Sequence, residues 1–84
     1  MRFIGIDAHR DFCEVAIVEG GEARGAGRIA TDPAELELFA RSLGRDDEVV
    51  LEATGNSLAI ARIIRPHVAR VVLANPKSAK GQCS

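Results

Sequence analysis

Apolar residues along the chain follow two periods, one typical of strands and one typical of helices. Short apolar runs, each bounded by charges or a turn, predict β-strands, and a weaker run rich in Gly and Ala predicts an edge strand. The predicted strands are residues 1–7, 12–18, 22–30, 48–52 and 70–74. We expect the first run, with Phe3, Ile4 and Ile6, to be buried on both faces of a sheet.

The segment between the third and fourth strands predicts a helix. Asp32 can cap its first turn, and Pro33 suits its first position. Its apolar stripe, spaced at i, i+3, i+4 and i+7, comprises Leu36, Phe39, Ala40 and Leu43. Gly44 is expected to end this helix.

A second helix is predicted between the fourth and fifth strands. Asn56 or Ser57 can cap it, and Pro66 forces its end nearby. Its apolar stripe comprises Ile60, Ile63 and Ile64.

The element order is therefore three strands, helix, strand, helix, strand. Hairpins join the first three strands, and each helical crossover returns the chain to a parallel neighbour. The simplest result is an α/β fold with a mixed five-stranded sheet in the order 3-2-1-4-5, which is the ribonuclease H-like (RuvC-like) arrangement. Two helices cannot cover both faces of five strands, so some apolar surface should stay uncovered.

Composition sets the class of protein. Of 84 residues 46% are apolar and the formal net charge is −1, as in globular rather than disordered chains, with no basic excess that would indicate nucleic acid. Cys13 and Cys83 lack metal-site spacing and are read as reduced thiols. Without an apolar stretch of about 20 residues or a signal-peptide pattern, we expect a cytoplasmic protein that does not enter membranes.

Carboxylates end two of the predicted strands. Asp7 ends the first and Glu52 ends the fourth, and adjacent parallel strands would bring them about 5 Å apart. At that distance two charges repel by about 3 kcal/mol at an effective dielectric of 20, and a divalent cation removes the conflict. Mg²⁺ or Mn²⁺ accepts one or two carboxylates and takes other ligands from substrate phosphate. Considered alone, Asp7 would be interpreted as a residue that makes an Asx-type turn. Glu52 alone would be interpreted as an acid that stabilises the N-terminus of the next helix.

Further residues are candidates for contacts with nucleic acid. Thr54, Gly55 and Asn56 follow Glu52 at a helix start, where backbone N–H groups can hold a DNA phosphate. Arg10 and its neighbour His9 lie in the turn after Asp7, where a solvated hairpin tip is the simpler interpretation. Lys77 and Lys80 belong to a basic polar tail at residues 77–84, beyond the folded domain at residues 1–76.

Three motifs in order resemble one protein family. They are Gly5-Ile6-Asp7-Ala8-His9-Arg10-Asp11, Leu51-Glu52-Ala53-Thr54-Gly55 and Val72-Leu73-Ala74-Asn75-Pro76. Together they resemble the N-terminal region of the DEDD insertion-sequence transposases, which include the Piv-type DNA invertases. The resemblance covers residues 2 to 80.

This resemblance implies a RuvC-like domain in which four acids bind divalent metal and act on DNA during recombination. Asp7 matches the first acid and Glu52 the second. The last two acids and a C-terminal serine domain of the family are not in this sequence, so we expect the 84 residues alone to be an inactive fragment. The family resemblance also implies DNA ends and targets as partners, together with a structured, guide-like RNA.

Three other hypotheses stay open. A RuvC-type Holliday-junction resolvase differs mainly in downstream acids. Sugar kinases and actin-like ATPases share the strand order, but their phosphate turn needs glycines where this chain has Ala8-His9-Arg10-Asp11. A non-catalytic module that dimerises through uncovered apolar surface is the third, and sedimentation would distinguish it from a monomer.

Overall fold

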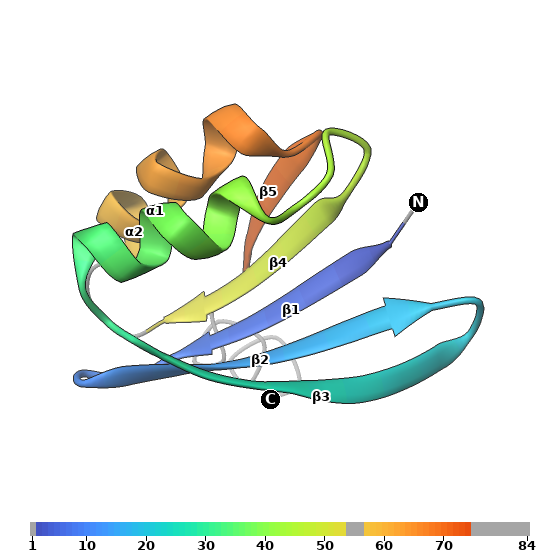
Figure 1. The fold of residues 1–84 in the computed structure, drawn as a ribbon, viewed down its shortest axis with the longest axis horizontal. Helices are drawn as coiled ribbons and strands as arrows, with labels where there is room; N and C mark the ends of the chain where they lie inside the picture. Colours follow the sequence, from blue (N-terminus) through green and yellow to red (C-terminus); the bar gives the residue numbers. More distant parts are fainter. Residues whose placement is uncertain (1, 54–56, 75–84) are drawn as a thin grey trace, which may run out of the picture.

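A computed structural model describes residues 2–53 and 57–74, and it contains the predicted five strands and two helices (Figure 1). The elements, in chain order, are β1 (Phe3–Ala8), β2 (Phe12–Glu19), β3 (Glu22–Ala30), α1 (Pro33–Arg41), β4 (Glu48–Ala53), α2 (Ser57–Ile64), a 3-10 turn η1 (Arg65–His67) and β5 (Arg70–Ala74). The predicted tail at 77–84 lies outside the described residues. No helix in the described ranges is long and apolar enough to cross a membrane.

The strands form one mixed sheet in the order β3-β2-β1-β4-β5, which confirms the predicted order. β1 pairs antiparallel with β2, and β2 pairs antiparallel with β3. β1 and β4 run parallel, as do β4 and β5. Each parallel connection includes a helix, as the geometry of parallel strands requires.

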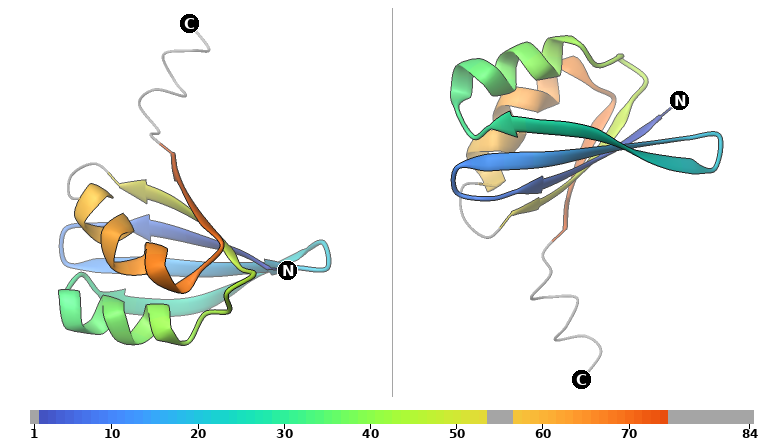
Figure 2. Two further views of the ribbon diagram at one scale, coloured as in Figure 1. Left: turned by 90° about the horizontal axis from the view of Figure 1, so that it is seen from above. Right: turned by 60° about the horizontal axis from the view of Figure 1, so that its bottom comes forward.

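Both helices pack on the same face of the sheet (Figures 1 and 2). The core lies between them and the sheet, and its buried members are Ile4, Ile6, Ala8, Cys13, Val15, Leu36, Ala40, Val49, Leu51, Ile60 and Ile64. We call the opposite face of the sheet the open face, because no helix of the described residues covers it.

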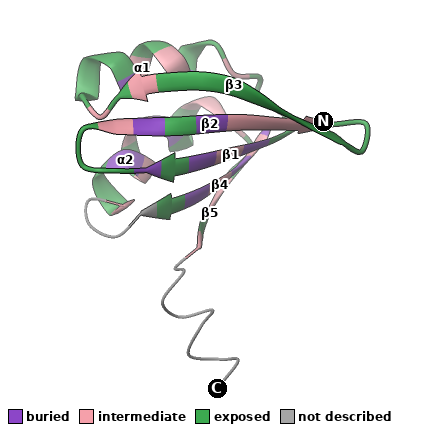
Figure 3. Cartoon of the chain, turned by 90° about the horizontal axis from the view of Figure 1, so that it is seen from below, coloured by how far each residue is buried: buried purple, intermediate pink, exposed green. Residues whose placement is uncertain are grey.

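The expectation that the first strand is buried on both faces is therefore wrong. Along β1, Ile4 and Ile6 are buried while Phe3 is 43% exposed and Asp7 is exposed, an alternation visible in Figure 3. The apolar run reads as continuous because Phe3 on the open face is apolar as well. The prediction that two helices leave apolar surface uncovered is confirmed.

The first helix begins as predicted and ends earlier. The Asp32 carboxylate accepts hydrogen bonds from the backbone N–H groups of Ala34 and Glu35 at 3.1 and 3.2 Å, and Pro33 takes the first helical position. Regular α-helix ends at Arg41 rather than at Gly44. The chain tightens there, because the amides of Ser42 and Leu43 bond to carbonyls three residues back.

The second helix also follows the prediction. Ile60 and Ile64 are buried and Ile63 packs against the core. Pro66 lies within η1, where the α-helix has given way to a 3-10 turn, as expected for a residue without an N–H donor. The predicted cap at Asn56 lies outside the described residues.

A bulge in the β2–β3 hairpin changes which residues of β3 face the same way. The register shifts between Val15 and Ala16, so that Ala16 pairs with Gly25 and Glu14 pairs with Arg28. Simple alternation would put residues 25 and 28 on opposite faces; the extra residue puts both on the open face. Gly27, with φ of +104°, supplies the backbone conformation that the bulge needs.

One ion pair ties the starts of β1 and β4 together. Arg2 donates Nε and Nη2 hydrogen bonds to the two carboxylate oxygens of Asp47, at 3.2 and 2.7 Å. The same carboxylate accepts the Gly44 amide at 2.8 Å. The Glu48 amide donates to the Arg2 carbonyl at 2.9 Å, and the Ala69 amide donates to the Asp47 carbonyl at 2.9 Å. Asp47 therefore connects the beginnings of β1, β4 and β5.

We predict that Asp47→Ala destabilises the fold by about 2 kcal/mol, because it leaves the Gly44 amide and the Arg2 side chain without their acceptor. For a domain of this size the melting temperature should fall by roughly 10 °C. Thermal unfolding followed by circular dichroism measures this change. Asp46→Ala, an exposed neighbour, is the matched control, and an equal loss in both variants would contradict the role of Asp47.

The same ion pair should make stability depend on pH in the acid range. The hydrogen bond from Arg2, with a further one from the Gly44 amide, holds the pKa of Asp47 below its ordinary value near 3.8, against an opposing effect of burial. A depressed folded-state pKa means that this stabilisation is complete above about pH 4 and is lost as the pH falls toward the folded value. Urea unfolding between pH 2 and 6 should show this loss in the wild type. The Asp47→Ala variant should show a shallower acid slope.

Candidate functional site

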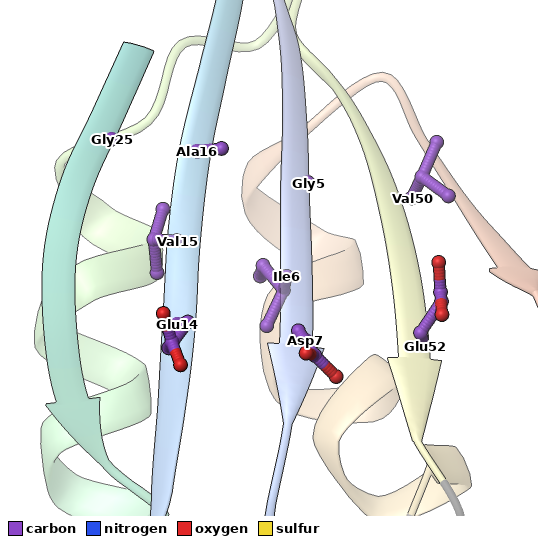
Figure 4. Close-up of a pocket in the computed structure, with 9 residues that line it drawn as sticks. All are labelled: Gly5, Ile6, Asp7, Glu14, Val15, Ala16, Gly25, Val50 and Glu52. Carbon is purple, nitrogen blue, oxygen red and sulfur yellow. The ribbon is translucent and has the colours of Figure 1, made fainter.

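The two predicted acids lie side by side on the open face. Asp7 of β1 and Glu52 of β4 are partners in the parallel register, as predicted. Both side chains are exposed, and both line one hollow of about 370 Å³ on the sheet (Figure 4). The parallel pairing of two strands thus brings together residues 45 positions apart in the sequence.

The carboxylates share this surface without pointing directly at each other. In Figure 4 the Asp7 carboxylate turns toward β4, whereas the Glu52 side chain runs along its own strand toward Val50. Within the described ranges, no group of three or more His, Cys, Asp and Glu side chains is close enough to hold a metal ion. The ligand set that the described residues offer is therefore a pair of carboxylates.

Small residues make the floor of the hollow. Ala16, Gly5 and Val50 lie beside one another on β2, β1 and β4, and Gly25 continues the same line on β3. Gly5 has no side chain to fill the space, and the nearest atom that a Cβ there would meet is the Ala16 carbonyl oxygen, 3.9 Å away. The surface is hollow at this point because two of these four neighbours are glycines.

The acids belong to a longer line of charged residues that we call the charged row: Arg28, Glu14, Asp7 and Glu52, one from each of β3, β2, β1 and β4. Arg28 Nη2 lies 3.7 Å from Glu14 Oε1. Sequence reasoning missed Glu14 and Arg28. Glu14 could have been found from the β1–β2 hairpin, because the residue opposite Asp7 follows from the short turn. Arg28 could not, because its face depends on the bulge.

His9 is exposed in the β1–β2 turn, as the sequence suggested, and it also makes two contacts there. Its Nε2 lies 3.2 Å from Asp7 Oδ2, and its ring stacks on Phe12 with centroids 4.7 Å apart. The Arg28 guanidinium also lies over the Phe12 ring, 4.5 Å from its centroid. A continuous set of contacts therefore runs from Asp7 through His9 and Phe12 to Arg28.

The remaining candidates are less informative. Arg10 is exposed in the β1–β2 turn. His67 lies in η1, and its Nε2 is 2.7 Å from Glu37 Oε2 of α1, away from Asp7 and Glu52. The candidates that lie outside the described residues are Thr54, Gly55, Asn56, Lys77 and Lys80.

The donor chemistry of the acid pair fits Mg²⁺ or Mn²⁺. Both ions prefer oxygen ligands, and Mg²⁺ in proteins usually takes one or two carboxylates and keeps several waters. Asp7 and Glu52 supply two such carboxylates on an accessible surface. Two exposed acids on adjacent strands also repel each other, which a cation would relieve.

Comparisons with known proteins give a fold and no family. The sequence matches no protein-family model and no curated protein. Among solved structures, a Bacteroides thetaiotaomicron protein described as having an actin-like ATPase fold and unknown function is similar, with a TM-score of 0.68. The identity is 11%, and the match covers 87% of this chain and 32% of that one. The likeness shows a shared fold, over about a third of the length of that protein.

Proposed function

We propose that this chain is the N-terminal part of a DNA transposase or site-specific recombinase with a ribonuclease H-like fold, in which Asp7 and Glu52 bind Mg²⁺ or Mn²⁺. One observation carries the proposal: the two acids are register partners on adjacent parallel strands, on the face of the sheet that no described helix covers. The resemblance of the three sequence motifs to DEDD transposases supports the same residues.

The arrangement suits chemistry on phosphodiesters. A bound divalent cation would polarise a phosphate oxygen and lower the pKa of a water molecule. Asp7 and Glu52 would hold that cation from one side, and the side away from the sheet would stay accessible to a DNA backbone. His9 Nε2 lies 3.2 Å from Asp7 Oδ2 and its ring stacks on Phe12, so it would limit the rotamers of the Asp7 carboxylate.

A pair of carboxylates is half of the four-acid set that the family resemblance implies. Two-metal chemistry needs ligands around ions about 3.5–4 Å apart, and two acids do not supply them. We therefore propose that the full activity requires further acidic residues beyond those described, and that these 84 residues bind cation weakly and do not cleave DNA.

We predict that Mg²⁺ shifts the carboxylate ¹³C resonances of Asp7 and Glu52 in a saturable titration at millimolar concentrations. Asp7→Asn and Glu52→Gln should each weaken binding roughly tenfold or more, because each removes one of two charged ligands. Mn²⁺ should broaden the resonances of the same residues.

Glu48→Gln is the matched control for this titration. Glu48 lies on the same strand and the same face as Glu52, at the other end of β4, where its Oε1 is 3.6 Å from Arg70 Nε. Its substitution should leave Mg²⁺ affinity unchanged. Absence of any shift at Asp7 and Glu52, or an equal effect of Glu48→Gln, would sink the proposal.

The fold neighbour favours a second candidate, a nucleotide-binding part of an actin-like ATPase. The described β1–β2 turn argues against it, because the His9 amide donates to the Phe12 carbonyl at 2.8 Å and so does not point at a phosphate. The turn also has no residue with positive φ that would aim successive amides at one anion. We predict that ATP with Mg²⁺ gives no thermal protection beyond that of Mg²⁺ alone; protection by ATP would replace the transposase proposal.

A further inference from the structure

One nitrogen donor lies beside the acid pair. His9 Nε2 is 3.2 Å from Asp7 Oδ2, and the two side chains are 44% and 61% exposed. Asp7 therefore belongs to two pairs of donors, one with Glu52 across the parallel strands and one with His9 along the chain. The second pair offers a nitrogen and an oxygen, which is a different ligand chemistry from two carboxylates.

The β1–β2 turn holds His9 in place. The amide of His9 donates to the Phe12 carbonyl at 2.8 Å, and its carbonyl accepts the Thr31 hydroxyl at 2.9 Å. Its ring stacks on the Phe12 ring with an interplanar angle of 30°. Because the backbone and the ring of His9 are both held, little conformational entropy would be lost when its nitrogen binds a ligand.

The distance between the two donor atoms suits a shared metal ion. Metal bonds of about 2.1 Å separate two neighbouring ligand atoms by about 3.0 Å at a right angle and by about 3.4 Å at the tetrahedral angle. The 3.2 Å between His9 Nε2 and Asp7 Oδ2 lies between these values. By contrast, His67 Nε2 and Glu37 Oε2 are 2.7 Å apart, as close as in a direct charge-assisted hydrogen bond. A shared ion would have to push that second pair apart.

The charges around His9 and Asp7 favour a cation. Three acids, Asp7, Glu14 and Glu52, line the hollow on the open face, and no basic residue of the described ranges lines it. Arg28, the basic member of the charged row, is already paired with Glu14 at 3.7 Å. A neutral imidazole beside Asp7 leaves the carboxylate charge uncompensated, so a divalent ion is attracted to this point.

An imidazole nitrogen separates one class of divalent ion from another. Mg²⁺ prefers oxygen ligands and keeps several waters, whereas Zn²⁺ and related first-row transition-metal ions bind imidazole readily. Proteins hold Zn²⁺ through His nitrogen and Asp oxygen at about 2.0–2.2 Å. One nitrogen and one carboxylate oxygen therefore favour a transition-metal ion over Mg²⁺.

We propose that Asp7 Oδ2 and His9 Nε2 bind one divalent transition-metal ion that accepts imidazole, such as Zn²⁺, and that His9 gives the site its preference for such an ion over Mg²⁺. This inference rests on the proposed function for what the bound ion does, and it adds the nitrogen donor and the class of ion. Phe12 and Thr31 contribute by holding His9 beside Asp7.

Long-range ¹H–¹⁵N correlation spectra of the imidazole rings, recorded while Zn²⁺ is added to the 84-residue chain, test the proposal. Every sample carries Cys83→Ser, because a free thiol would itself bind Zn²⁺. The Nε2 resonance of His9 should shift saturably, and far more with Zn²⁺ than with Mg²⁺. Measured at the Asp7 carboxylate, His9→Gln should weaken Zn²⁺ binding roughly tenfold more than Mg²⁺ binding, because it removes a ligand that Mg²⁺ does not use.

His67 is the matched control. Its neighbour Glu37 already has Arg41 Nε 3.3 Å from Oε2, so this second imidazole–carboxylate pair has its own cation. His67→Gln should leave Zn²⁺ affinity unchanged, and the His67 resonances should stay in place at concentrations that saturate His9. Equal shifts of the two histidines, or no shift of His9 Nε2, would overturn the proposal. So would an equal loss of Zn²⁺ and Mg²⁺ binding in His9→Gln, because His9 would then only position Asp7.

The two proposals fail separately. If Mg²⁺ shifts the carboxylates of Asp7 and Glu52 while Zn²⁺ leaves His9 Nε2 unshifted, the nitrogen ligand is wrong and the acid pair stands. If Zn²⁺ shifts His9 and Asp7 while Mg²⁺ shifts neither carboxylate, the function proposed for the acid pair is wrong and the transition-metal site stands.

Discussion

The parallel pairing of β1 with β4 is the constraint on which the rest of the structure depends. A slip of one residue would turn every side chain of one strand to the other face, burying an acid and exposing an isoleucine. The ion pair between Arg2 and Asp47 fixes the register where β1 and β4 begin. Arg2 precedes Asp7 by five residues, and Asp47 precedes Glu52 by five residues. The alignment of Asp7 with Glu52 is therefore secured by an ion pair at the far end of the same two strands.

The one-sided arrangement of the helices then gives the sheet two different faces. The side chains under α1 and α2 form the apolar core, which includes residues of β1, β2 and β4. The open face carries no such packing demand, so it can hold glycine, alanine and four charged residues in a line. Like charges on adjacent strands destabilise the fold by a few tenths of a kcal/mol to about 1 kcal/mol per pair. Here they lie on a face that does not contribute to the packing of the core.

The contacts around Asp7 depend on two features, the short β1–β2 turn and the bulge in β3. The β1–β2 turn returns His9 and Phe12 toward the end of β1, and the bulge in β3 brings Arg28 over the same ring. The turn places His9 beside Asp7, and the bulge places Arg28 on the same face of the sheet. The acid pair comes from the parallel neighbours β1 and β4, and the arginine comes from β3, which is separated from β1 by β2.

By itself the sequence determined the elements, their order and the acid pair. Asp32 with Pro33, the stripe through Leu36 and Ala40, and the short apolar runs are local signals, and two acids that end parallel neighbours must meet. Only the tertiary structure decided that β1 is buried on one face, that His9 contacts Asp7, and that Arg28 shares their surface while Arg24 does not. These features depend on which face of the sheet the helices cover and on the extra residue of the β3 bulge. Both are decided by contacts between segments that lie far apart in the sequence, so local sequence patterns do not reveal them.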